Sequence, residues 1–168
     1  MSTFRGSNLA AILCASLALT GCTGSPSAPL ATATNPSTCD GVHLVVDFAS
    51  LGPDPVDTCV DVTGDTSAAD VLAAAELATQ GTADYGNAIV CRVNGQPAAD
   101  TPVELMSGSY TEDCADMPSA DAYWSVWVET NGVWDYAQVG FNDLVLRSGD
   151  GLALSYTLNG NAEPPQGR

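Results

Sequence analysis

The stretch Ala122-Tyr-Trp-Ser-Val-Trp-Val-Glu-Thr-Asn-Gly-Val-Trp-Asp-Tyr136 (AYWSVWVETNGVWDY) decides how the sheet of this protein is built. It holds all three tryptophans of the chain and two of its five tyrosines. Residues 123–129 are rich in aromatic and β-branched side chains, which predicts the strongest strand of the sequence. Asn131-Gly132 is a hairpin-turn signal, so we expect residues 134–136 to run back antiparallel to that strand.

The two faces of the predicted strand differ in character. Trp124, Val126 and Val128 share one uniformly apolar face, which we expect to lie in the core beneath a helix. The other face mixes aromatic rings with Ser125 and Glu129, a composition typical of a half-open surface. Hairpin register decides whether the second strand adds its rings to that face, and the sequence leaves the register open. The candidate ligand-binding residues of the hairpin are Tyr123, Trp127, Asn131, Trp134, Asp135 and Tyr136.

The rest of the chain predicts an α+β fold, a mixed sheet crossed by one helix. Residues 42–48 and 57–62 are expected to form a first strand hairpin, and residues 88–93, 143–147 and 151–158 further strands. Residues 66–80 are expected to form the one substantial helix, capped by Thr66 or Ser67 with Asp70 in a capping-box position, and ended by Gly81. Residues 96–119 are expected to be a long irregular segment.

The first 22 residues have the features of a lipoprotein signal peptide. Arg5 precedes an apolar run too short to span a bilayer, and the run ends in Leu19-Thr20-Gly21-Cys22, which resembles a bacterial lipobox. In such signals the cysteine becomes the N-terminus and carries fatty acyl chains such as palmitate. We therefore expect Cys22 to anchor the protein to the cell membrane from the extracytoplasmic side. The alternative is an ordinary secretory peptide cut near the same place.

Composition divides the chain after Cys22 into three parts. Residues 23–38 are rich in Thr, Ser, Ala and Pro and carry no charge, so we expect a disordered tether. Residues 39–158 mix apolar and acidic side chains and are long enough for one folded domain with a real core. Residues 159–168 again have the composition of a disordered tail.

The charge of the chain restricts its partners. Twenty acidic residues stand against four arginines, with no lysine, for a formal net charge of −16. Nucleic-acid binding is not expected, because little could neutralise phosphates. The acidic residues are scattered along the chain, which favours a solvated, self-repelling surface over a dedicated cation-binding face.

Cysteine usage also points to an exported protein. Once Cys14 and Cys22 are assigned to the signal and the lipid, four remain, an even number that predicts two disulfides. Three pairings are open, and we expect the sequential one. The predicted strand hairpin does not by itself place the first two of these cysteines, Cys39 and Cys59, opposite each other. A zinc site is the rival, but no C-x-x-C spacing exists and His43 is the only histidine, so we expect no metal and no cofactor. The sequential bonds are Cys39–Cys59 and Cys91–Cys114.

Enzymatic activity is not expected. His43 lies within a predicted strand without a G-x-S-x-G motif, the mature thiols are committed to disulfides and lipid, and no glycine-rich phosphate loop is present. Among many acidic residues, no carboxylate pair is marked by its spacing.

A series of short motifs resembles one family. Val46-Asp47-Phe48, TSAADVL at residues 66–72, Tyr85-Gly86 and Val93-Asn94-Gly95 occur in its order. They are followed by Tyr123-Trp124-Ser125, Asn131-Gly132-Val133-Trp134-Asp135-Tyr136, Gly140 and Gly149-Asp150. Over residues 42–158 the chain resembles a bacterial domain family related to the C-terminal β-domain of transcobalamin and intrinsic factor. It departs at Leu154, where the family often has an aromatic residue.

The resemblance implies a β-grasp fold and non-catalytic binding of a soluble ligand. In the vitamin carriers the ligand lies between this β-domain and a helical barrel, and no barrel is predicted here, so cobalamin is not specifically implied. We therefore expect a lipid-anchored protein that binds a small soluble ligand and works with a transporter subunit or another partner. The alternative is a surface interaction module, such as a protease inhibitor or an adhesin, using the ordered loop 96–117.

Overall fold

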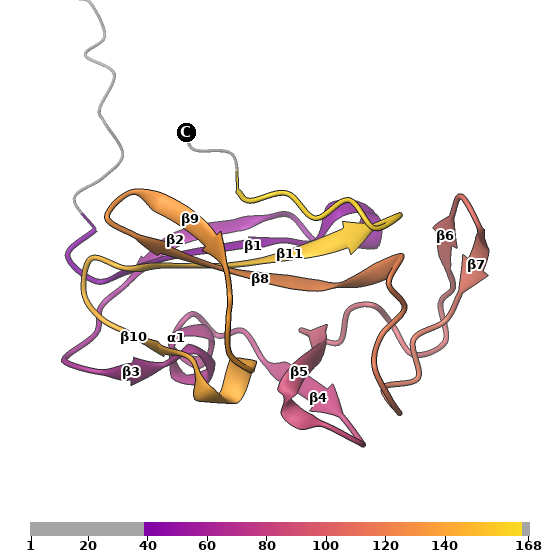
Figure 1. Cartoon of the computed structure of the whole chain (residues 1–168), viewed down its shortest axis with the longest axis horizontal. Helices are drawn as coiled ribbons and strands as arrows, with labels where there is room; N and C mark the ends of the chain where they lie inside the picture. The colour runs from indigo at the N-terminus through magenta and orange to yellow at the C-terminus, as the bar shows by residue number, and fades with distance from the viewer. Residues whose placement is uncertain (1–38, 166–168) are drawn as a thin grey trace, which may run out of the picture. The chain divides into compact units, whose positions relative to one another are not determined.

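The main feature of the computed structural model, which describes residues 39–165, is a five-stranded mixed sheet (Figure 1). Its spatial order is β2-β1-β11-β8-β9. The central strands β1 and β11 are parallel, whereas β2, β8 and β9 each pair antiparallel with a neighbour. The strands are β1 (Val42–Asp47), β2 (Val56–Val60), β8 (Ala122–Thr130), β9 (Val133–Tyr136) and β11 (Gly151–Leu158).

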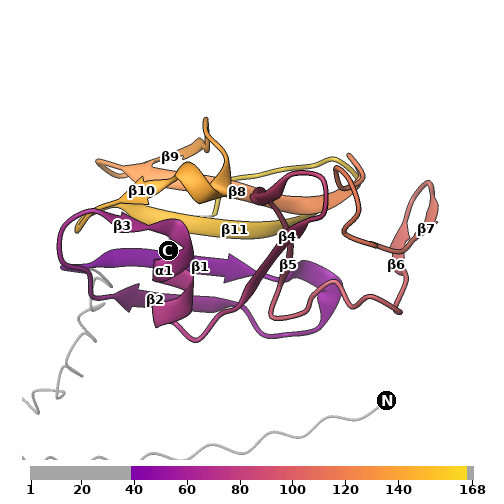
Figure 2. The same ribbon diagram turned by 90° about the horizontal axis from the view of Figure 1, so that it is seen from below.

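The second layer lies on one side of this sheet, as Figures 1 and 2 both show. It contains the helix α1 (Ala68–Ala74), and the strand pairs β3 with β10 and β4 with β5. A further hairpin, β6 with β7, lies at one end of the sheet (Figure 1). The remaining elements are η1 (Ala49–Leu51), β3 (Thr66–Ser67), β4 (Thr79–Thr82), β5 (Gly86–Val93), β6 (Val103–Leu105), β7 (Gly108–Tyr110), η2 (Phe141–Asp143) and β10 (Val145–Leu146). The α+β class is confirmed.

The core fills the space between the two layers. Trp124 is buried there as expected, with its ring edge-on to Phe48 at 5.4 Å and to Tyr156 at 5.3 Å between centroids. We call the sheet face that carries Trp124 the inner face. Its other buried side chains are Val42, Leu44 and Val46 of β1 and Leu152 and Leu154 of β11, packed with Ala68, Val71 and Leu72 of α1.

The helix α1 is capped by one of the two predicted capping residues, Ser67. The Ser67 hydroxyl accepts a hydrogen bond from the Asp70 backbone N–H at 3.1 Å and donates one to the Asp70 carboxylate at 2.7 Å. This reciprocal pair satisfies a backbone donor that the first turn of a helix leaves open.

The end of α1 was predicted wrongly. The helix stops at Ala74 rather than near Gly81, because Glu76 adopts a left-handed backbone with φ of 60°. The Leu77 backbone N–H then bonds the Leu72 carbonyl at 2.9 Å, and Leu77 is buried in the core. Burial of Leu77 outweighs the helix propensity of the alanines, and Gly81 lies in β4 instead.

The sequential disulfide pairing is confirmed. Cys39 reaches Cys59 because the chain before β1 crosses close over the end of β2 at Gly41, where a Cβ would collide with the Val60 carbonyl. Strand pairing alone would not place Cys39 opposite Cys59, and this crossing brings the two residues together. The Cα–Cα distances are 5.5 Å for Cys39–Cys59 and 5.7 Å for Cys91–Cys114.

The segment 96–119 is less irregular than predicted, because it contains the β6–β7 hairpin. The buried guanidinium of Arg92 holds this segment to β5. It donates to the carbonyl oxygens of Pro97 at 2.8 Å and of Glu112 at 2.6 Å, and it contacts the Cys114 sulfur at 2.6 Å.

The predicted signal, lipidation site Cys22 and tether lie outside the described residues, as do residues 166–168. Among residues 39–165, no helix has the length and apolar character needed to cross a membrane. Residues 159–165 form no helix or strand; they double back on the side of the sheet away from α1 (Figures 1 and 2).

Candidate functional site

The sheet face turned away from α1, which we call the outer face, gathers four of the candidate aromatic residues. On β8, Tyr123 and Trp127 alternate with the core residue Trp124 and so point outward. The register of β9 places Tyr136 opposite Trp127 and Trp134 opposite Glu129. Side chains on directly paired positions share a face, so both rings of β9 join the outer face. The register question that the sequence left open is thereby answered.

The two polar candidates lie elsewhere. Asp135 pairs with Val128 and therefore belongs to the inner side of the edge strand β9, where it is exposed. Asn131 sits at the tip of the hairpin with φ of 54°, beside Gly132 with φ of 79°. These values are those of the tight turn that Asn-Gly favours, and they give Asn131 a role in the turn itself. The structure thus brings four of the six candidates together and separates the other two.

Trp127 forms the floor of the aromatic group. It is 8% exposed, and its indole N–H donates to the Ser125 hydroxyl at 3.1 Å. That hydroxyl in turn donates to the Ser155 carbonyl at 2.9 Å. The Trp127 ring meets the Tyr136 ring at 4.9 Å between centroids, and Tyr136 is 41% exposed. A ligand on this face would therefore touch Tyr136 more than Trp127.

The two tyrosines of the group interact with each other. Burial, followed by the influence of the Tyr123 side chain, raises the pKa of Tyr136 to about 12. The Tyr136 hydroxyl therefore loses its proton only at a higher pH than an ordinary tyrosine.

A second group on the outer face, near the starts of β1 and β11, was not predicted. His43 of β1 lies between two carboxylates, with its Nε2 2.9 Å from Asp57 and its Nδ1 3.9 Å from Glu129. The His43 ring also faces the Trp134 ring at 6.2 Å between centroids. The sequence alone predicts an ordinary strand residue at His43. The alternation of buried Val42 and Leu44 around it is the signal that it points to the outer face.

Gly151 explains how these groups fit over the sheet. It starts β11 and pairs with His43 on one side and Glu129 on the other. A Cβ at this position would lie 2.8 Å from the Glu129 Cβ and carboxylate oxygen, and 2.9 Å from the Trp134 ring. The missing side chain is therefore what lets Glu129 and Trp134 lie down over the central strand.

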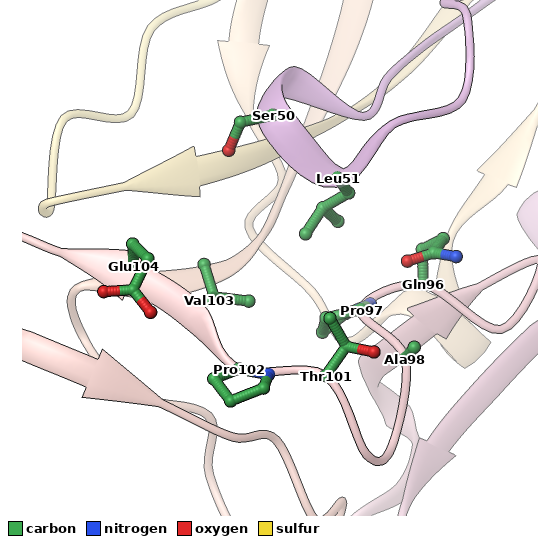
Figure 3. A pocket seen from close by; sticks show the side chains of 9 residues that line it. All are labelled: Ser50, Leu51, Gln96, Pro97, Ala98, Thr101, Pro102, Val103 and Glu104. Atoms are coloured by element: carbon green, nitrogen blue, oxygen red, sulfur yellow. The ribbon is translucent and has the colours of Figure 1, made fainter.

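A cavity of about 310 Å³ lies apart from the outer face, between η1 and the chain around the cis peptide Gln96–Pro97 (Figure 3). Its volume is at the lower end of the range for small-molecule sites, and Glu104 is its one titratable side chain. None of the predicted ligand-binding residues lines it. The lining residues are Ser50, Leu51, Gln96, Pro97, Ala98, Thr101, Pro102, Val103 and Glu104.

One cluster of the described residues has the composition of a metal site. Cys91, Glu112 and Cys114 place their ligand atoms within 4.8 Å of one another. The two sulfurs are bonded to each other, however, and are not available as thiolates. The Glu112 carboxylate is engaged by the Tyr110 hydroxyl and the Cys114 backbone N–H, each at 2.7 Å. This cluster is therefore explained by the loop it stabilises.

No protein-family model, curated protein or solved structure matches this chain.

Proposed function

We propose that this protein is a lipid-anchored, extracytoplasmic binding protein that holds a small soluble ligand, without catalysis, on the outer face of its sheet. The observation that carries the proposal is the register of β9, which adds Trp134 and Tyr136 to the face of Tyr123 and Trp127. Aromatic side chains present large apolar faces and lose little rotamer entropy on binding, which suits flat, partly polar ligands.

The arrangement of the sheet supports a β-grasp fold. The first and last strands form a parallel central pair, each is flanked by an antiparallel neighbour, and one helix packs on the inner face. This agrees with the resemblance to the transcobalamin and intrinsic factor β-domain, whose relatives bind soluble ligands. The second layer covers the inner face, and residues 159–165 double back over part of the outer face (Figure 1). The part of the outer face proposed for binding is therefore the one around the exposed Tyr136 and the half-buried Trp134.

Two observations support an extracytoplasmic, membrane-anchored location. The two disulfides indicate an oxidising, extracytoplasmic environment. The sequence ending at Cys22 adds the lipid anchor, and residues 23–38 add a tether. A binding domain held near the membrane in this way is suited to pass its ligand to a transporter subunit.

Tryptophan fluorescence provides the test, because Trp134 is half-buried on the proposed face while Trp124 and Trp127 are buried. The protein is titrated with corrinoids, haem and neutral glycans, and we expect at least one class to change the emission saturably. Tyr136→Leu should weaken that response. Tyr85→Leu is the matched control, because Tyr85 is comparably exposed at 50% but lies in the turn between β4 and β5. A flat response to every class, and also to the organic cations and their neutral partners tested below, would refute the proposal.

A second candidate function is favoured by one observation. The β6–β7 hairpin carries Met106 at its tip with 84% of its surface exposed. The tip is held at the end of the sheet, because the Met106 backbone N–H donates to the Asn159 side chain at 2.8 Å and the Ser107 hydroxyl donates to Asp121 at 3.3 Å. The Cys91–Cys114 disulfide and Arg92 stiffen the segment from which it projects. An exposed apolar residue on a stiff loop suits a protease inhibitor or an adhesin. Inhibition of a protease panel that is lost in Met106→Asp, with ligand binding unchanged, would support this second function.

A further inference from the structure

One end of the outer face combines an aromatic ring with negative charge. Trp134 and Glu129 lie side by side over Gly151, each within 2.9 Å of where a Cβ of that glycine would stand. Asp57 lies on the other side of His43 from Glu129, and its carboxylate is hydrogen-bonded to His43 Nε2 at 2.9 Å. The side chain of Glu129 is 25% exposed and that of Asp57 33% exposed, so both carboxylates are partly withdrawn from water.

No arginine of the described residues forms an ion pair with Glu129, whose basic neighbour is His43 at 3.9 Å. All twenty acidic residues lie between Asp40 and Glu163, where the only arginines are Arg92 and Arg147. Arg92 is buried and hydrogen-bonded within the loop network. Arg147 pairs with Asp65 at 2.6 Å. An anionic ligand would therefore be repelled from the outer face, and a cationic one attracted to it.

We infer that the ligand of the outer face is an organic cation, an ammonium compound whose charged nitrogen rests against the Trp134 ring and beside the Glu129 carboxylate. This inference rests on the proposed function and specifies its ligand class. The negative face of an indole attracts an ammonium group, and indole is the strongest of the aromatic side chains in this respect. A partly desolvated carboxylate next to the ring adds direct Coulomb attraction. The exposed Tyr136 ring, two residues along the same strand, offers apolar surface for the rest of the ligand.

The test uses pairs of ligands that have the same shape and differ in charge. The full chain, in a nonionic detergent at low salt, is titrated with choline and with its neutral isostere 3,3-dimethylbutan-1-ol, and with butylammonium and butan-1-ol. Tryptophan emission is the readout. We expect each cation to bind about tenfold more tightly than its neutral partner, with a preference that shrinks as salt is raised.

Two variants with the same charge change locate the site. Glu129→Gln should weaken binding of the cation about tenfold, because it removes the carboxylate beside Trp134. Asp135→Asn is the matched control, since Asp135 lies on the same hairpin but on the other side of β9. It should change the affinity by about twofold at most. Trp134→Leu should reduce binding of choline more than binding of 3,3-dimethylbutan-1-ol, and ligand-observed NMR replaces fluorescence for this variant.

Two results would overturn the inference. Equal affinity for the charged and neutral members of both pairs, including no binding of either, would show that charge is not recognised. An equal effect of Glu129→Gln and Asp135→Asn would show that the whole acidic surface attracts cations, without a site at Trp134. Both results leave the proposed function standing if a corrinoid, haem or a glycan binds saturably.

Discussion

The two disulfides allow the effect of burial on stability to be separated from the effect of chain entropy. Their sequence separations are nearly equal, 20 residues for Cys39–Cys59 and 23 for Cys91–Cys114. In the chain-entropy description each bond therefore stabilises the fold by about 3 kcal/mol, and the two contributions differ by only about 0.1 kcal/mol. Any larger difference between the two must come from the folded state.

The folded-state surroundings of the two bonds differ strongly. Cys59 is exposed, whereas Cys91 and Cys114 are 2% and 5% exposed, and the Arg92 guanidinium contacts the Cys114 sulfur. Replacing Cys91 and Cys114 by serine leaves two small hydroxyls in a buried site and disturbs the bonds of Arg92. We expect a further loss of about 1–3 kcal/mol from these effects. The double serine variant of the buried pair should thus lose about 4–6 kcal/mol of unfolding free energy, against about 3 kcal/mol for the exposed pair.

Urea unfolding followed by tryptophan fluorescence measures both variants. The comparison uses the extrapolated free energies rather than the midpoints, because opening a cross-link expands the unfolded chain and changes the urea dependence. Equal losses in the two variants, or a larger loss for Cys39→Ser with Cys59→Ser, would refute the argument that Arg92 and burial strengthen the second bond.

Three further predictions concern single positions. Ser67→Ala should lower the unfolding free energy by about 1 kcal/mol, because it removes the cap of α1, and thermal unfolding would contradict this if the midpoint did not fall. Gly151→Ala should cost about 1–3 kcal/mol through the collision with Glu129 and Trp134, and should shift the tryptophan emission as the Trp134 ring is pushed off the strand. For Tyr136 the folded pKa of about 12 lies above the ordinary 10.0, so its stabilising contribution is complete below pH 10 and is lost as the pH rises towards 12. Unfolding free energy measured from pH 9 to 12 should therefore fall less steeply in Tyr136→Phe than in the unchanged protein.

Local signals were sufficient where neighbours in the sequence determine the structure. The Asn131-Gly132 turn has the backbone conformation that this pair favours, so the β8–β9 hairpin was predicted correctly from the sequence. The Ser67 cap follows from one side chain reaching three residues along the chain. The inner position of Trp124 follows from the two-residue period of a strand.

Contacts between distant residues were beyond the sequence. The end of α1 depends on the burial of Leu77, which no propensity within residues 66–80 expresses. The group around His43 needs Asp57 from β2 and Glu129 from β8 to meet across β1 and β11, and this requires the sheet order. Gly151 likewise gains its importance from Glu129 and Trp134, which belong to other strands.

The parallel pairing of β1 and β11 also determines how the domain would respond to mechanical force. Because β1 and β11 run parallel, the start of β1 lies at one end of the sheet and the end of β11 lies at the other (Figure 1). Tension applied between an anchor before Cys39 and a load after Leu158 would pull these two strands past each other. The hydrogen bonds between them would then have to break together rather than one by one. The Cys39–Cys59 bond spreads the same tension onto β2. If the domain is tethered to a membrane as proposed, it would therefore stay folded under pulling that would unzip a hairpin.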